Sequence, residues 1–236
     1  MTAALFTPLK LRELQLGNRI VVSPMCQYRA VDGTPTDWHP VHLAGLAMSG
    51  AALVFAEATG VSPEGRITPG CTGLYNSAHE AAWKRVVEVV RAVGRDGGTA
   101  KIGIQLAHAG RKASCAMPWD GGKQLSLEEG GWQTVAPSAV PFADSGERAP
   151  VALDHDGIAR LVRAFAESTE RAARIGFDVV EMHDAHGYLL HQFLSPLSNR
   201  RSDEYGGSLA NRMRFPLAVF AAMRAAFPQH KPVGVR

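Results

Sequence analysis

Two histidines three residues apart and a following tyrosine give the clearest chemical signal in the sequence: His183, His186 and Tyr188. They come directly after residues 177–182, a short apolar run that predicts a buried strand. A single histidine here would most simply be a hydrogen-bonded core residue, but two beside a tyrosine and a glycine fit that explanation poorly. Two imidazole N–H groups can stabilise a carbonyl or nitro oxygen that gains negative charge, and a phenol beside them can supply a proton.

A metal centre is the alternative for the same segment, with His183, Asp184 and His186 as ligands. Against a metal centre, no His-X-His motif lies on the first predicted strand, and no further ligand stands out elsewhere. These residues alone therefore leave two enzyme classes open. One uses the imidazoles as donors to a carbonyl or nitro oxygen, and the other is a metal-dependent hydrolase of barrel fold.

Two other predicted strands also end in reactive or polar side chains. Residues 19–24 lead into Cys26 and Tyr28, whose thiol and phenol could line a flat aromatic cofactor. A buried core thiol is an equally good explanation of Cys26. The strand predicted at 101–106 carries Gln105, whose amide can pair with a ring edge that has both donors and acceptors. Lys112 adds a positive charge nearby, although a solvated basic turn is the simpler explanation for it.

The elements that must position these side chains alternate along the chain. Apolar runs predict strands at 19–24, 52–57, 101–106, 177–182 and 232–236, and amphipathic patterns predict helices at 36–48, 79–93, 157–174 and 209–226. Asp156 is the expected N-cap of the third helix and Gly176 its stop. This alternation predicts parallel βαβ units.

Two architectures fit such units, a doubly wound sheet and a (β/α)8 barrel. No GxGxxG motif follows the first strand, and the candidate site residues follow several different strands, as in a barrel. The sequence therefore predicts an α/β fold, a (β/α)8 TIM barrel of which this chain carries about the first five strands and four helices. Residues 109–154 show no convincing helix, which predicts a long active-site loop after the third strand.

Composition excludes several classes of protein. The 236 residues carry a net charge of +3, and the densest basic cluster, at Arg200 and Arg201, is followed after one serine by two acidic residues. No basic stripe suggests nucleic-acid binding, and a solvated loop is the better interpretation of that cluster. Three scattered cysteines, the lack of a signal-peptide pattern and the lack of a membrane-spanning apolar run lead us to expect a reduced, cytoplasmic protein.

Six segments together resemble one family. They are NRIVVSPMCQY, DWHPVHLAGLA, EATGVSPEGRITPG, IQLAHAGRKAS, HDAHGYLLHQFLSPLSNRRSDEYGGSLANR and VGVR. In order and spacing they resemble the Old Yellow Enzyme family of flavin-dependent ene-reductases and NADPH dehydrogenases, and most of all its bacterial thermophilic-like class. The resemblance implies an FMN-containing barrel. Hydride would pass from NADPH or NADH through FMN to the activated C=C bond of an unsaturated carbonyl or nitro compound.

The resemblance also implies a role for each candidate residue. His183 and His186 would bind the activating oxygen of the substrate, Tyr188 would donate the proton, and Tyr28 would face the substrate. The residues expected to contact the flavin are Ser23, Pro24, Met25, Cys26, Ala58, Gln105 and Arg236, with Cys26 tuning its potential. No metal is expected. The partners implied are small activated alkenes and, for the complete enzyme, further copies of itself, but neither a nucleic acid nor a membrane.

The family pattern continues beyond the segments present here. Its last three βα units, which carry the FMN-phosphate site, have no counterpart in these 236 residues. We therefore expect residues 1–236 to be the N-terminal portion of a single FMN-binding barrel domain. The remaining units would come from a second polypeptide or from continuing chain. A flavin-binding fragment that is inactive without its complement is the non-enzyme alternative.

Overall fold

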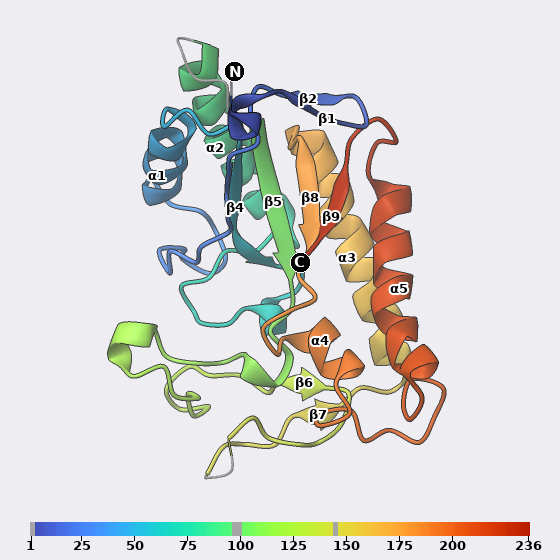
Figure 1. The fold of residues 1–236 in the computed structure, drawn as a ribbon. Coiled ribbons are helices and arrows are strands. Elements are labelled where there is room, and N and C mark those ends of the chain that lie inside the picture. Colours follow the sequence, from blue (N-terminus) through green and yellow to red (C-terminus); the bar gives the residue numbers. More distant parts are fainter. Residues whose placement is uncertain (1–2, 96–100, 144–145) are drawn as a thin grey trace.

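Five parallel strands form the centre of the molecule (Figure 1). The computed structural model describes residues 3–95, 101–143 and 146–236. The strands lie in the order β3 (Val21–Val22), β4 (Leu53–Gly60), β5 (Lys101–Ala107), β8 (Val179–Met182) and β9 (Val233–Val235). Every neighbouring pair is parallel. The five predicted strands are thus confirmed, and β3 and β9 form the two edges of this sheet within the described residues.

Four long helices connect and cover these strands, as predicted. They are α1 (Trp38–Ala47), α2 (Ser77–Arg95), α3 (His155–Ile175) and α5 (Leu209–Ala226). The N-cap prediction for α3 is wrong by two residues: Asp154 caps the helix and accepts the Gly157 N–H at 2.7 Å. Gly176, with φ of 102°, ends α3 as expected. In the part of the chain that the structure describes, no helix has the length and apolar content to cross a membrane.

The core has two parts, one on each face of the sheet. The helices bury large side chains against one face, among them Trp83, Phe165 and Phe215. A smaller cluster around Leu16 and Phe55 packs on the other face. Leu16 comes from the hairpin of β1 (Leu9–Leu11) and β2 (Leu14–Leu16), which lies across the amino ends of the strands (Figure 1). Strands this short give too little alternation to be predicted.

The segment between β5 and α3 lies beyond the carboxyl ends of the strands (Figure 1). Its described residues contain no α-helix, which agrees with the predicted loop. They form two 3-10 turns, Gly110–Lys112 and Pro118–Asp120, and a small parallel pair of β6 (Val135–Ala136) and β7 (Val151–Ala152). The short helix α4 (Leu189–Leu194) lies beside this pair and follows the histidine segment. Loop and helix together cover the end of the sheet where the candidate residues gather.

The prediction of a solvated loop at the basic cluster is wrong for Arg201. Its side chain is only 10% exposed, and its guanidinium donates to the carbonyls of Pro137 and Leu153 and to the Asp203 carboxylate. The two carbonyls flank the β6–β7 pair. The planar guanidinium has five N–H donors and can bind several acceptors at once. In Arg201 these acceptors belong to the protein, whereas those of a solvated arginine are water molecules. Arg201 therefore fastens the carboxyl ends of β6 and β7 to the segment after α4.

We expect Arg201→Lys to lower the free energy of unfolding by about 2 kcal/mol, because an ammonium cannot replace the fork of hydrogen bonds. Urea denaturation measures the change, with Arg200→Lys as the matched control on an exposed neighbour. Equal effects of the two substitutions would contradict the anchoring role of Arg201.

Candidate active site

Three aromatic rings converge just past the end of β8. The His183 ring centre lies 5.0 Å from the ring centres of both His186 and Tyr188, and the latter two are 6.4 Å apart. All three pairs meet edge to face. His186 has a φ of 57° and Gly187 a φ of 73°, so the chain turns sharply between the two histidines and the tyrosine. The structure thus brings together the three residues that the sequence singled out.

Gln192 on α4 holds this turn in place. Its amide nitrogen donates to the carbonyls of Gly187 (2.7 Å) and Ala109 (3.1 Å), and its amide oxygen accepts the Arg111 N–H at 3.2 Å. Gly110 has a φ of 61°, and a Cβ there would lie 2.3 Å from the same amide oxygen, so only glycine fits. Sequence reasoning missed Gln192, because a glutamine inside an apolar helix carries no chemical signal of its own.

His183 is a neutral hydrogen-bond donor. Burial, followed by the charges of His186, Arg236 and Lys112, lowers its pKa from 6.5 to about 4. Its Nδ1 accepts the Ala185 N–H at 3.4 Å, so the ring hydrogen is on Nε2. At neutral pH this imidazole can therefore donate one N–H without carrying a charge. The pKa of the more exposed His186 is lowered as well, by burial and then by Arg236 and Lys112.

Tyr188 caps the start of α4 and keeps its proton. Burial raises the pKa of its phenol, and so do the neighbouring Cys26 and Tyr28. Lys112 lies beside it, with Nζ 5.0 Å from the tyrosine ring centre and donating to the His186 carbonyl at 2.9 Å. A solvated turn is therefore the wrong interpretation of Lys112, whose pKa burial lowers. The amine is part of the wall of the histidine cluster.

The segment after β3 approaches the same place. Ser23, Pro24, Met25 and Cys26 are half-buried or exposed along it. A hydrogen bond with Cys71, then burial and the nearby charge of Glu57, raise the pKa of the Cys26 thiol. Burial also raises the pKa of Tyr28 to about 12, and its ring meets the ring of Trp119 edge to face at 5.7 Å.

Three more predicted residues lie on or directly after strands of the sheet. Ala58 and Gln105 are paired across β4 and β5, and both are buried. The Gln105 amide donates to the Glu181 carboxylate at 2.7 Å, a partner that the sequence did not reveal. Arg236 follows β9, where its N–H donates to the Met182 carbonyl at 3.0 Å. Its charge is close enough to lower the pKa of both histidines.

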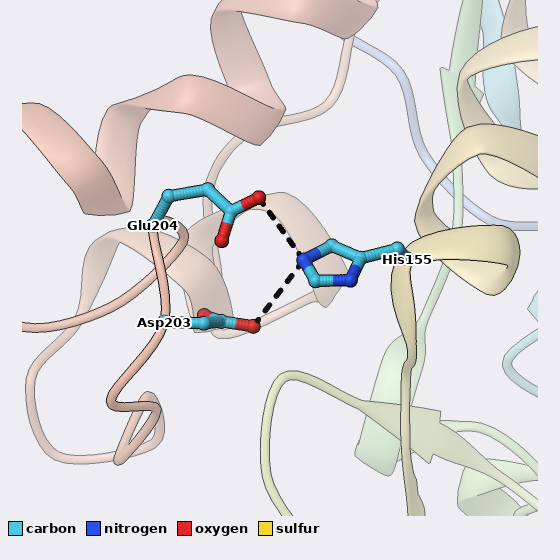
Figure 2. A group of neighbouring side chains, drawn as sticks. All are labelled: His155, Asp203 and Glu204. Carbon is cyan, nitrogen blue, oxygen red and sulfur yellow. Dashed lines mark ion pairs between the residues drawn. The ribbon is translucent and has the colours of Figure 1, made fainter.

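The structure does not bring His183, Asp184 and His186 together as metal ligands. Among the described residues, the group whose possible ligand atoms lie within 4.8 Å of one another is His155, Asp203 and Glu204. The His155 Nε2 atom lies 3.0 Å from a Glu204 oxygen and 3.7 Å from an Asp203 oxygen, and these ion pairs are drawn in Figure 2.

Arg201 already pairs with Asp203 and lowers the pKa of that carboxyl. His155 is 61% exposed at the first residue of α3. The group is therefore best explained as ion pairs between the start of α3 and the turn at 203–204.

Comparison with known proteins agrees with the geometry. The model of the NADH:flavin oxidoreductase / NADH oxidase family matches residues 4–236. NADH:flavin oxidoreductase FG08077 of Gibberella zeae is 44% identical over 98% of this chain and 55% of its own length. NADPH dehydrogenase of Geobacillus thermodenitrificans is 43% identical over 95% of this chain and 60% of its own length.

Solved structures show the same fold. Morphinone reductase in complex with tetrahydroNAD matches 100% of this chain and 64% of its own, with a TM-score of 0.82 and 35% identity. Old Yellow Enzyme from Pichia sp. AKU4542 matches 99% of this chain and 59% of its own, with a TM-score of 0.85 and 30% identity. This chain thus spans less than two thirds of the length of these relatives.

These matches confirm the expected barrel fold and, at the level of the family, a flavin cofactor with a nicotinamide hydride donor. The chain belongs to the NADH:flavin oxidoreductase / NADH oxidase family, which is the Old Yellow Enzyme family that its motifs predicted.

Proposed function

We propose that this chain forms the substrate-binding part of an FMN-dependent NAD(P)H oxidoreductase that reduces the activated C=C bond of unsaturated carbonyl or nitro compounds. The observation that carries the proposal is the convergence of a neutral imidazole donor, a second imidazole and a protonated phenol within 6.4 Å at the carboxyl edge of the sheet. When bound, FMN supplies the hydride that it has taken from NADPH or NADH.

The residues at this edge fit a flat polar ring. Ala58 and Gln105 lie side by side on β4 and β5, one small and one able to donate and accept hydrogen bonds. Met25 and Cys26 offer polarisable sulfur atoms from the segment after β3. Arg236 offers a fixed positive charge, which suits a ring edge that becomes negative on reduction. Ser23 and Pro24 complete the residues proposed to hold the flavin.

His183 and His186 are proposed to bind the activating oxygen of the substrate. Negative charge develops on this oxygen as the β-carbon is reduced, and a fixed N–H donor stabilises that charge. One such donor is worth about 3 kcal/mol in the transition state. The Nε2–H of His183 suits this task because the buried ring is neutral. A charged imidazolium in the same place would need an anion beside it.

Tyr188 is proposed to protonate the α-carbon, and Tyr28 to face the substrate. Burial raises the pKa of the Tyr188 phenol, so the proton is in place at neutral pH. Its ring lies 5.0 Å from that of His183, so one small molecule can reach both groups. General acid catalysis needs the proton donor within hydrogen-bond distance of the bound substrate.

We further propose that residues 1–236 are the N-terminal portion of one eight-stranded barrel domain, with about its first five strands and four helices. The relatives extend well beyond the matched region, and β3 and β9 are edges of the sheet in the described residues. A filled barrel of this kind needs eight strands. The FMN-phosphate site and the remaining units would come from further polypeptide, in the same chain or another.

The proposal as a whole is tested with the protein purified together with the rest of the barrel. We expect a visible flavin spectrum and oxidation of NADPH that depends on an added enone. Colourless protein with stoichiometric zinc would contradict the proposal. Yellow protein that never oxidises NADPH would reduce it to flavin binding alone.

We expect His183→Ala and His186→Ala each to slow alkene reduction by about 100-fold and to weaken binding of phenol ligands, because each removes one donor to the activating oxygen. Bound FMN should remain. Stopped-flow reoxidation and ligand titration measure both effects, with the exposed His155→Ala as control. Loss of FMN from both variants, with ligand affinity intact in the remaining holoprotein, would contradict the assignment.

Tyr188→Phe should leave flavin reduction by NADPH unchanged and slow reoxidation by enones, since only the second half-reaction needs the proton. Stopped-flow absorbance separates the two half-reactions. Partial activity is compatible with proton donation by water. Equal slowing of both half-reactions would show that Tyr188 is structural.

The His183 ring should stay neutral until the pH falls to about 4. The unfolded chain takes up this proton at higher pH, near the ordinary value of 6.5, so stability should fall as the pH drops from 6.5 towards 4. Heteronuclear NMR of the imidazole follows the titration, with assignment by His183→Gln. A midpoint near the ordinary value would contradict the buried, neutral donor.

A further inference from the structure

β4 carries a bulge beside the candidate active site. Ala56 pairs with Ile104 and Ala58 with Gln105, so Glu57 is an extra residue opposite the continuous strand β5. Bulges re-aim side chains and recur next to functional sites. The re-aimed side chain here is a carboxylate that is 3% exposed, and the function proposed above gives it no role.

Both oxygens of Glu57 accept hydrogen bonds. One lies 3.1 Å from Nε2 of His39 on α1, and the other accepts the Gln27 N–H at 3.2 Å. The Thr36 N–H points at Nδ1 of His39 from 2.9 Å, so the hydrogen of this ring is on Nε2 and is donated to Glu57. Glu57 therefore binds α1 through one oxygen and the segment after β3 through the other.

The segment that Glu57 contacts needs such an anchor. Residues 23–30 belong to no helix or strand. The side chain of Gln27 is tied to α1 by the Trp38 indole at 3.2 Å. Tyr28 follows with a φ of 54°, a conformation that costs a non-glycine residue about 1–3 kcal/mol and persists only where the surroundings enforce it. Glu57 supplies the hydrogen bond to the backbone one residue before this strain.

The charge of Glu57 reaches several titratable groups. Those facing it are His39 and His42 on α1, and Cys26, Tyr28 and Cys71. Cys26 is also faced by Tyr188 at the start of α4 and by the Ala58 N–H. The hydrogen bond with Cys71 and burial raise the pKa of Cys26, and the Glu57 carboxylate acts in the same direction.

We infer that Glu57 is a positioning residue. Its carboxylate, aimed by the β4 bulge and bonded to His39, fixes the segment 25–28, which includes Cys26, through the Gln27 N–H. The inference rests on the proposed function in one respect: that function makes the segment 25–28 part of a flavin and substrate site. The hydrogen bonds and the charge stand without it.

The test is the pH profile of Cys26 alkylation by iodoacetamide in the purified protein, read for that cysteine alone by mass spectrometry of its peptide. Glu57→Gln removes the charge, so the profile should move to lower pH and alkylation below the parent midpoint should become severalfold faster. Glu57→Asp keeps the charge and should stay close to the parent. Glu64→Gln, at a partly buried carboxylate paired with Arg160, is the matched control and should change nothing.

A second measurement needs no variant. The Gln27 amide should exchange slowly with deuterium although it lies outside every strand, because Glu57 accepts its hydrogen. Fast exchange of this amide would overturn the positioning role, and so would a Glu57→Gln profile that superimposes on the parent. Neither readout needs NADPH or an alkene, and because Cys26 is proposed to contact the flavin, parent and variants are compared at equal flavin content. Failure of the inference is therefore distinguishable from failure of the proposed function, which the spectrum and NADPH oxidation test.

Discussion

Parallel pairing of five strands is the constraint on which the rest of the structure depends. Because β3, β4, β5, β8 and β9 all run the same way, every strand delivers its carboxyl end to one edge of the sheet. Residues as far apart in the chain as Cys26 and Arg236 become neighbours of the histidine segment at this edge. The helices pack on one face of the sheet and Leu16 of the β1–β2 hairpin on the other, and the candidate polar residues gather at the carboxyl edge.

Burial at that edge decides which groups carry charge. It makes His183 neutral and keeps Tyr188 protonated, so two groups that could ionise act instead as neutral donors. Lys112 and Arg236 supply positive charge at the margin of the cluster, and Glu57 supplies negative charge on the side of Cys26. A site with neutral donors between charges of opposite sign suits a reaction in which charge appears on the substrate only briefly.

The sequence predicts this fold wherever a local pattern repeats over enough residues. The stripes of α2 and α3 and the apolar runs of β4 and β5 are long enough to be recognised, and the residues after the strands stand out by their chemistry. Arg201 and Gln192 do not, because they donate to backbone carbonyls of segments distant in the sequence, at Pro137, Leu153 and Ala109. The β1–β2 hairpin is too short to show a period. Contacts of this kind exist only once the chain has folded.

Two buried polar side chains, Gln192 and Glu57, perform the same task beside the candidate site. His186 and Tyr28 both adopt left-handed backbone, with φ of 57° and 54°. The residue next to each is fastened by a buried side chain: Gln192 binds the carbonyl of Gly187, and Glu57 binds the N–H of Gln27. Each strained residue costs about 1–3 kcal/mol, comparable with the one or two hydrogen bonds that its anchor makes, especially where the acceptor is charged. The hydrogen bonds that hold each turn therefore offset the local strain, and His186 and Tyr28 keep their backbone conformations beside the site.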